Sequence, residues 1–133
     1  MAAFHPPRGL TGTGSPATPD DIAAASDAIG GSVHPRLLDL YAHTDGFLTD
    51  DGVTVYDAAS LAERNDTFEV GTYATGYLLI GDDSGGRGFL LALDDPQSPV
   101  YVTDLGDLHP PGFEVAGASM DAWLDTVAGG AAG

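Results

Sequence analysis

The sequence contains no cysteine, no lysine and no long hydrophobic run. Without cysteine the chain can form no disulfide, no thiolate nucleophile and no thiolate metal site. No stretch approaches the roughly 18 apolar residues that a membrane-spanning helix requires. Residues 1–8 also lack the charged and then apolar layout of a signal peptide. We therefore expect a cytoplasmic protein with no membrane partner.

Positive charge is also scarce. The chain has 20 acidic residues against 4 basic ones, which gives a formal net charge of −16 over 133 residues. A field of this sign attracts basic partners and repels nucleic acid. Hydrophobic residues make up 43% of the chain, which is enough to fill the core of one small domain. The composition therefore predicts a folded, acidic binding protein with a basic protein partner and no nucleic-acid partner.

The N-terminal third of the chain predicts an arm followed by two helices. Residues 1–17 are rich in glycine, proline, serine and threonine, so we expect a flexible arm or a short irregular edge there. Thr18 is a suitable N-cap and Pro19 suits the first helical position, and the two aspartates that follow face the positive end of the helix dipole. Gly30 ends this helix, and a second helix begins near Pro35.

From residue 50 onward the pattern changes to a period of two and to short apolar runs, both of which are typical of strands. The alternation occupies 53–56, and the strand-like runs occupy 77–80, 89–93 and 99–102. The pattern predicts a central antiparallel β-sheet.

Two further helices complete the prediction. A brief helix begins after Asp57, and a closing helix begins after its N-cap Ser119. The order of the segments predicts a single α+β domain over 18–128, with N-terminal helices, a central antiparallel β-meander and a closing C-terminal helix. We expect the tail at 129–133 to fray.

The glycine-rich loop at 81–88 follows a strand, as a phosphate-binding loop does, but it has no lysine and leads into another strand, so we interpret it as a hairpin turn. The four histidines lack zinc spacing, and the paired aspartates do not continue into a calcium-binding loop. Ser119 lacks the closing glycine of a nucleophile elbow and is better explained as a helix cap. We therefore expect no catalytic residue, no metal and no cofactor.

The acidic loops and their neighbouring tyrosines are the candidate partner-binding residues. Aromatic side chains supply contact area at interfaces, and the surrounding charge selects the partner. The candidates are Asp50, Asp51, Asp82, Asp83, Asp94, Asp95, Asp104, Asp107, Tyr56 and Tyr73. Tyr77 and Phe113 suit either an interface or the rim of a core, whereas Tyr41, Phe89 and Trp123 lie on apolar stripes and are expected in the core.

The order of several short motifs between Thr18 and Val127 resembles the SUKH superfamily, which includes the fungal Smi and Knr cell-wall regulators and many bacterial immunity proteins. The motifs are Pro19-Asp20-Asp21-Ile22, Gly30-Gly31, Leu40-Tyr41, Asp45-Gly46-Phe47, Leu61 to Asn65, Leu78 to Gly86, Phe89-Leu90-Leu91, Pro99-Val100-Tyr101 and Ala118 to Leu124. The chain departs from the superfamily at Ser26, where an acidic residue is common, and at His34-Pro35, where Leu-Pro is usual.

The resemblance implies an α+β protein without catalytic residues. In bacteria such proteins often neutralise a toxin, frequently a nuclease or a nucleic-acid deaminase, by direct binding. A regulatory, scaffolding or biosynthetic accessory module that binds a peptide or an enzyme is the alternative. An acidity that reflects a salt-rich habitat is a third explanation. A toxin gene immediately upstream would favour the first hypothesis and a biosynthetic gene cluster the second.

Overall fold

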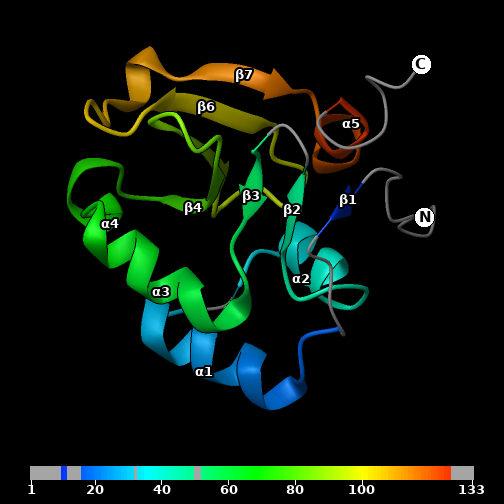
Figure 1. The fold of residues 1–133 in the computed structure, drawn as a ribbon. Helices are drawn as coiled ribbons and strands as arrows, with labels where there is room; N and C mark the ends of the chain where they lie inside the picture. The colour runs from blue at the N-terminus through cyan, green and yellow to red at the C-terminus, as the bar shows by residue number, and fades with distance from the viewer. Residues whose placement is uncertain (1–9, 12–15, 32, 50–51, 127–133) are drawn as a thin grey trace.

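The computed structural model describes residues 10–11, 16–31, 33–49 and 52–126. It has the α+β organisation expected from the sequence, with helices before and within a meander of strands and a helix after the last strand (Figure 1). The elements in chain order are β1 (Leu10–Thr11), α1 (Pro19–Ile29), α2 (Pro35–Tyr41), β2 (Phe47–Thr49), β3 (Thr54–Val55), α3 (Ala58–Thr67), α4 (Val70–Tyr73), β4 (Tyr77–Asp82), β5 (Arg87–Ala92), β6 (Val100–Asp104), the 3-10 helix η1 (Pro110–Gly112), β7 (Glu114–Gly117) and α5 (Met120–Leu124).

The strands form one antiparallel sheet in which each strand pairs with the next along the chain, so that β1 and β7 lie at its two edges. The predicted hairpin is confirmed. Tyr77 pairs with Ala92 at one end of β4 and β5, and Asp82 pairs with Gly88 at the other. The short strands β1, β2 and β7 were not predicted, because two to four residues carry no clear alternation.

Helix α1 has the predicted caps at both ends. The Thr18 hydroxyl accepts a hydrogen bond from the Asp21 N–H at 3.1 Å, and the Thr18 N–H donates to the Asp21 carboxylate at 3.3 Å. This reciprocal pair satisfies two backbone donors that the first turn would otherwise leave open. Gly30 ends the helix with a φ of 78°, a left-handed conformation that costs glycine little. Figure 1 shows α1 side by side with α3 beneath the sheet.

His34 is the buried N-cap of α2. Its Nδ1 accepts a hydrogen bond from the Arg36 N–H at 3.0 Å, so the other ring nitrogen, Nε2, carries the proton and donates to the Asp95 carbonyl at 2.8 Å. The imidazole therefore ties the start of α2 to the loop between β5 and β6.

Asn65 on α3 takes the place of a neighbouring strand at one residue of β4, Leu79. The last residue pair between β3 and β4 is Val55 with Gly81, and one further bond runs from the Tyr56 N–H to the Ile80 carbonyl. Beyond that point the Asn65 side chain accepts from the Leu79 N–H at 2.8 Å and donates to the Leu79 carbonyl at 2.9 Å. Buried backbone groups without partners are costly, so the amide of Asn65 both satisfies β4 and fixes α3 against the sheet.

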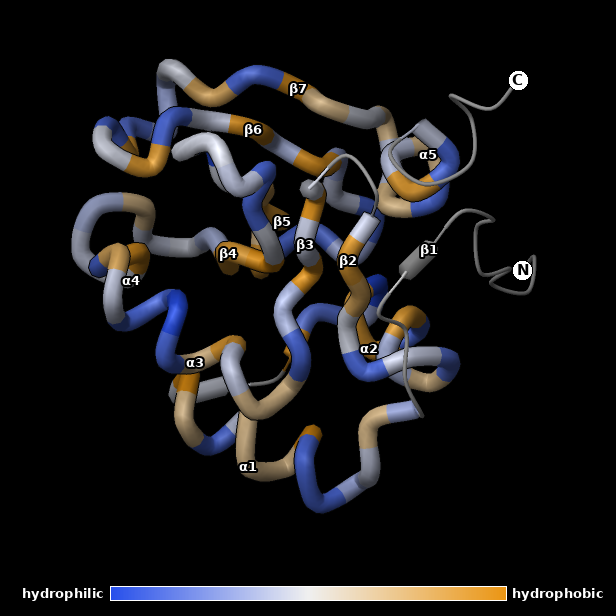
Figure 2. Tube along the Cα trace, in the orientation of Figure 1, coloured by the Kyte–Doolittle hydropathy of each residue, from blue (hydrophilic) through white to orange (hydrophobic). Residues whose placement is uncertain are grey.

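The hydrophobic core lies between the sheet and the helices, and the strands that line it are among the most hydrophobic segments in Figure 2. The expected core residues Tyr41, Phe89 and Trp123 are buried there. The rings of Phe89 and Trp123 lie 4.8 Å apart between centroids. Gly117 permits this packing, because a Cβ at that position would meet the Cβ of Trp123 at 2.6 Å.

The folded chain includes residues from the segment for which we expected a flexible arm. Leu10–Thr11 forms β1 and pairs with β2. Ala17 is buried, and its N–H donates to the Tyr41 carbonyl at 2.9 Å. The remaining residues up to 15, and the tail expected to fray at 129–133, lie outside the described residues. Within the described ranges, no helix is both long enough and apolar enough to cross a bilayer.

Truncation of Trp123 should remove a large part of the stability of the domain. Its side chain is 1% exposed, and Trp123→Ala is expected to lower the free energy of unfolding by about 3–5 kcal/mol. Leu93→Ala is the matched control, because Leu93 is 42% exposed; it should cost less than about 1 kcal/mol. Urea denaturation followed by circular dichroism measures both. Wild-type stability in Trp123→Ala would show that this side chain does not support the core.

Candidate binding groove

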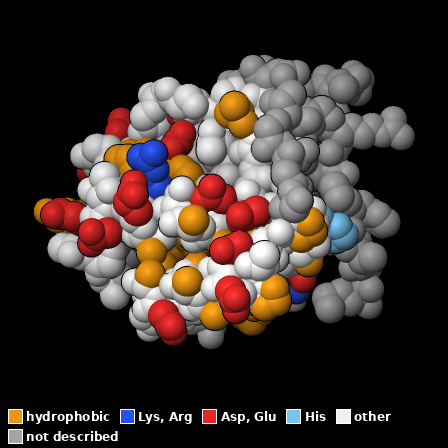
Figure 3. Space-filling model, turned by 60° about the horizontal axis from the view of Figure 1, so that its bottom comes forward, with side chains coloured by type: hydrophobic (Ala, Val, Ile, Leu, Met, Phe, Trp, Pro, Cys, Tyr) orange, Lys and Arg blue, Asp and Glu red, His pale blue; other side chains and the backbone are white. Residues whose placement is uncertain are grey.

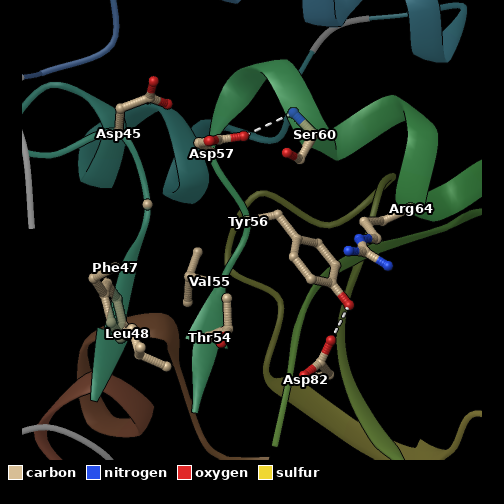
Figure 4. Close-up of a pocket in the computed structure, with 11 residues that line it drawn as sticks. Asp45, Phe47, Leu48, Thr54, Val55, Tyr56, Asp57, Ser60, Arg64 and Asp82 are labelled. Atoms are coloured by element: carbon tan, nitrogen blue, oxygen red, sulfur yellow. Dashed lines mark hydrogen bonds between the residues drawn. The ribbon is translucent and has the colours of Figure 1, made fainter. Parts of the chain in front are cut away.

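A groove of about 410 Å³ opens where β3 leaves the sheet and α3 begins. Its walls come from the turn before β2, from β2 and β3, from the first turns of α3 and from the end of β4 (Figure 4). Three aspartates, Asp45, Asp57 and Asp82, line it with one arginine, Arg64. The carboxylates therefore outnumber the guanidinium in the lining.

Two of these carboxylates hold the start of α3. Asp57 is the N-cap, and its Oδ1 accepts from the Ser60 N–H at 2.8 Å. Asp45 comes from the turn before β2, and its Oδ1 accepts from the Ala58 N–H at 2.7 Å. Each uses one oxygen in this way, and the other oxygen has no hydrogen-bond partner in the described part of the chain.

Gly46 brings the turn that carries Asp45 against the end of β3. Its φ is +79°, and a Cβ at this position would lie 2.6 Å from the Val55 carbonyl oxygen and 2.8 Å from the Asp57 nitrogen. A residue with a side chain would push the two segments apart. Glycine is therefore required here for Asp45 to reach the first turn of α3.

Tyr56 and Asp82 form the opposite wall of the groove. The Tyr56 hydroxyl donates to Asp82 Oδ2 at 2.6 Å, and the Arg64 guanidinium lies 5.8 Å from the centre of the Tyr56 ring. Figure 4 shows the ring pointing from the end of β3 toward Asp82, with Arg64 beside it. Burial raises the pKa of the Tyr56 phenol above its usual range, and the bond to Asp82 adds to this effect, so the phenol stays a neutral donor.

The hairpin loop beyond Asp82 is held by its own aspartates. Asp82 Oδ1 accepts from the Ser84 N–H at 2.9 Å, and Asp83 Oδ1 accepts from the N–H groups of Gly85 at 2.8 Å and Arg87 at 3.1 Å. The Ser84 hydroxyl donates to the Gly52 carbonyl at 2.6 Å. These bonds fix the acidic hairpin beside the start of β3.

The structure separates the predicted partner-binding residues into two groups. Tyr56 and Asp82 line the groove, and Asp83 lies next to them in the hairpin. Asp104 belongs to the same end of the sheet, because it pairs with Arg87 across β5 and β6. Asp107 follows in the next turn, where its N–H donates to the Asp104 carbonyl.

The remaining candidates do not join this group. Asp94 and Asp95 follow the other end of β5, where the Asp95 carbonyl meets His34. Tyr73 is 58% exposed on α4, away from the groove lining. Asp50 and Asp51 lie outside the described residues. From composition, the paired aspartates among the candidates were predicted to form one binding surface. In the structure the described ones lie at different ends of the sheet, because the direction of each strand decides the end at which the following loop lies.

Asp45 and Arg64 were not predicted as groove residues from the sequence, and Asp57 was predicted only as a helix cap. No short-range pattern points to Asp45, since its partner Ala58 is 13 residues away. Among the described residues, no group of three or more acidic or histidine side chains is placed to hold a metal ion. The chemistry that the groove offers is the binding of a cationic group by carboxylate oxygens.

No family model matches the chain, and no curated protein is significantly similar to it in sequence. The resemblance to the SUKH superfamily therefore stays a prediction that rests on the order of the motifs.

The phenol of Tyr56 should contribute to stability in a pH-dependent way. Because the folded state raises its pKa above the usual 10.0, the neutral phenol stabilises the fold at neutral pH, and this contribution is lost as the pH rises above about 10. Tyr56→Phe should lower the free energy of unfolding at pH 7 by about 1–3 kcal/mol, since a bond to a carboxylate is lost. It should also flatten the fall of stability above about pH 10.

Urea denaturation at pH 7 and at about pH 10.5 measures both effects. Tyr73→Phe is the control, because it removes the same hydroxyl from a side chain that is 58% exposed. It should change stability by less than about 0.5 kcal/mol at both pH values. An unchanged pH profile in Tyr56→Phe would contradict the pKa assignment.

Proposed function

We propose that this protein is a non-catalytic, cytoplasmic immunity protein that neutralises a basic toxin by direct binding. The observation that carries the proposal is the groove whose lining holds three aspartates, two of them with one oxygen uncommitted, and a single arginine. A lysine or arginine side chain of a partner can enter the groove without leaving a buried charge unpaired, because the aspartate carboxylates bind it there. Nucleases and deaminases that act on nucleic acid carry such basic side chains, because their substrate is anionic.

The charge of the whole molecule supports the same function. The net charge is −16, and the view from the helical side in Figure 3 shows acidic side chains spread over that face with few basic ones among them. Complementary charge acts mainly on the rate of association. An inhibitor that must bind a toxin before the toxin reaches nucleic acid benefits from a high association rate.

The resemblance to the SUKH superfamily points in the same direction. We propose that the chain is a member, and that it acts as the bacterial members do, by occupying a toxin and not by chemistry of its own. The uncommitted oxygens of Asp45 and Asp57 and the acidic hairpin at Asp82 and Asp83 form the proposed contact surface.

The salt dependence of association tests this proposal. The probe is the purified protein encoded by the gene immediately upstream, and surface plasmon resonance measures the two rate constants. Raising the salt concentration to about 0.5 M shortens the Debye length to a few ångströms. Association should then slow at least about tenfold, while dissociation changes less. In cells, co-expression of this protein should restore the growth that the upstream product inhibits.

Two pairs of substitutions separate the groove from the general field. Asp82→Asn with Asp83→Asn should slow association several-fold, and the asparagines can keep the turn bonds through Oδ1. Asp27→Asn with Asp121→Asn changes the net charge equally at exposed positions outside the groove lining, and it should have a smaller effect. An acidic partner, an association rate indifferent to salt, or equal effects of the two pairs would refute the proposal.

A further inference from the structure

Strand β7 forms an open edge of the sheet. It pairs with β6 on one side, and Figure 1 shows no described helix or strand along its other side. In the described part of the chain, the backbone groups of residues 114–116 that point away from β6 have no hydrogen-bond partner. Unpaired N–H and C=O groups in a row are a template for a further strand.

A row of side chains across one face of the sheet ends exposed at this edge. Leu90 pairs with Tyr101, and Tyr101 pairs with Val115, so the three side chains lie on the same face. Leu90 is fully buried, Tyr101 is half-buried, and Val115 is 60% exposed. The rings of Tyr77 and Phe113 pack around Tyr101 at 5.6 and 6.3 Å between centroids. One more strand would bury Val115 and complete the row.

The opposite face of the same edge is acidic. Glu114 pairs with Val102, so its side chain lies on the other face from that of Val115. Glu114, Asp104 and Asp107 line a hollow of about 300 Å³ there, together with Arg87. A strand beside β7 would therefore place alternate side chains against an apolar row and against an acidic hollow.

We propose that β7 is the docking edge for an extended segment of the basic partner, in which apolar residues alternate with arginine or lysine. The segment adds a strand to the sheet by backbone hydrogen bonds, its apolar side chains cover Val115 and Tyr101, and its basic side chains face Glu114, Asp104 and Asp107. This proposal rests on the proposed function in one respect, namely that the partner is basic.

Charge decides between this occupant and a second copy of the chain. Two copies joined through β7 would bring together two molecules that each carry a formal charge of −16. The acidic hollow of each copy would face a chain that has 4 basic residues in total. A basic segment relieves this repulsion, whereas a second copy increases it.

A designed peptide tests the edge directly. The probe is a fluorescein-labelled peptide of about six residues, a usual strand length, in which arginine alternates with valine. Fluorescence anisotropy should show that it binds at least about tenfold more tightly than the same peptide with alternate backbone nitrogens methylated, since methylation removes strand donors and keeps the charge. It should also bind more tightly than a peptide of the same composition with its arginines and valines in separate blocks.

Two variants carry an equal change of charge. Val115→Asp should weaken binding at least about tenfold although it makes the protein more acidic, because the apolar row loses its last member. Leu93→Asp, at another exposed apolar position, should bind as the wild type does. Hydrogen exchange of the wild type should show that the peptide slows exchange of backbone amides within residues 114–116, which tests the edge even if Val115→Asp does not fold.

Two outcomes would overturn the edge proposal, and two further outcomes distinguish its failure from that of the proposed function. Equal binding of the methylated peptide would show that no strand is added. A dimer in sedimentation equilibrium that Val115→Asp dissolves would make a second copy the occupant. If the upstream product binds with the expected salt dependence and Val115→Asp leaves its affinity unchanged, the edge proposal fails and the proposed function stands. If β7 captures the alternating peptide but the upstream product is not bound, the proposed function fails and the edge proposal stands.

Discussion

The backbone of Tyr56 joins the helical layer to the sheet near the middle of the chain. Its N–H donates to the Ile80 carbonyl at 2.9 Å, and its carbonyl accepts from the buried Tyr41 hydroxyl at 2.8 Å. One residue thus connects β4 to α2, and the next residue, Asp57, begins α3. At the candidate groove the core holds this main chain, while the Tyr56 ring, which is 5% exposed, reaches Asp82 in the groove lining. Loss of this junction would disturb the fold and the groove together.

The parts of the fold that follow local rules could be predicted from the sequence. The caps at Thr18, Asp57 and Ser119 and the hairpin from β4 to β5 depend on residues a few positions apart. Other contacts join residues far apart in the chain and could not be predicted in this way. The Asn65 amide bonds to Leu79, 14 residues away, and the Tyr56 hydroxyl donates to Asp82, 26 residues away. Tyr56 and Asp82 were named as candidates, but their contact was not, because composition does not tell which loops share an end of a sheet.

The many acidic residues stabilise loops and helix ends in addition to creating a negative electrostatic field. Aspartates account for 17 of the 20 acidic residues, and the short side chain of aspartate reaches its own neighbouring backbone, as in the Asx turns and helix caps described above. A carboxylate that closes a turn with one oxygen is held in place and can still offer the other oxygen to a cation. The same residues therefore shape the loops and supply the charge. Glutamate, with one more rotatable bond, would lose more side-chain entropy in that double role.

The bond from the Ser84 hydroxyl to the Gly52 carbonyl has a consequence for the thermodynamics of recognition. It links the tip of the β4–β5 hairpin to the segment that enters β3, two loops 32 residues apart in the chain. Loops that are free to move must be ordered when a partner arrives, and each ordered side chain or backbone segment subtracts from the affinity. Here part of that ordering has taken place during folding. If the acidic hairpin binds the proposed partner, it does so as a preorganised surface, and the entropy of complex formation is correspondingly less unfavourable.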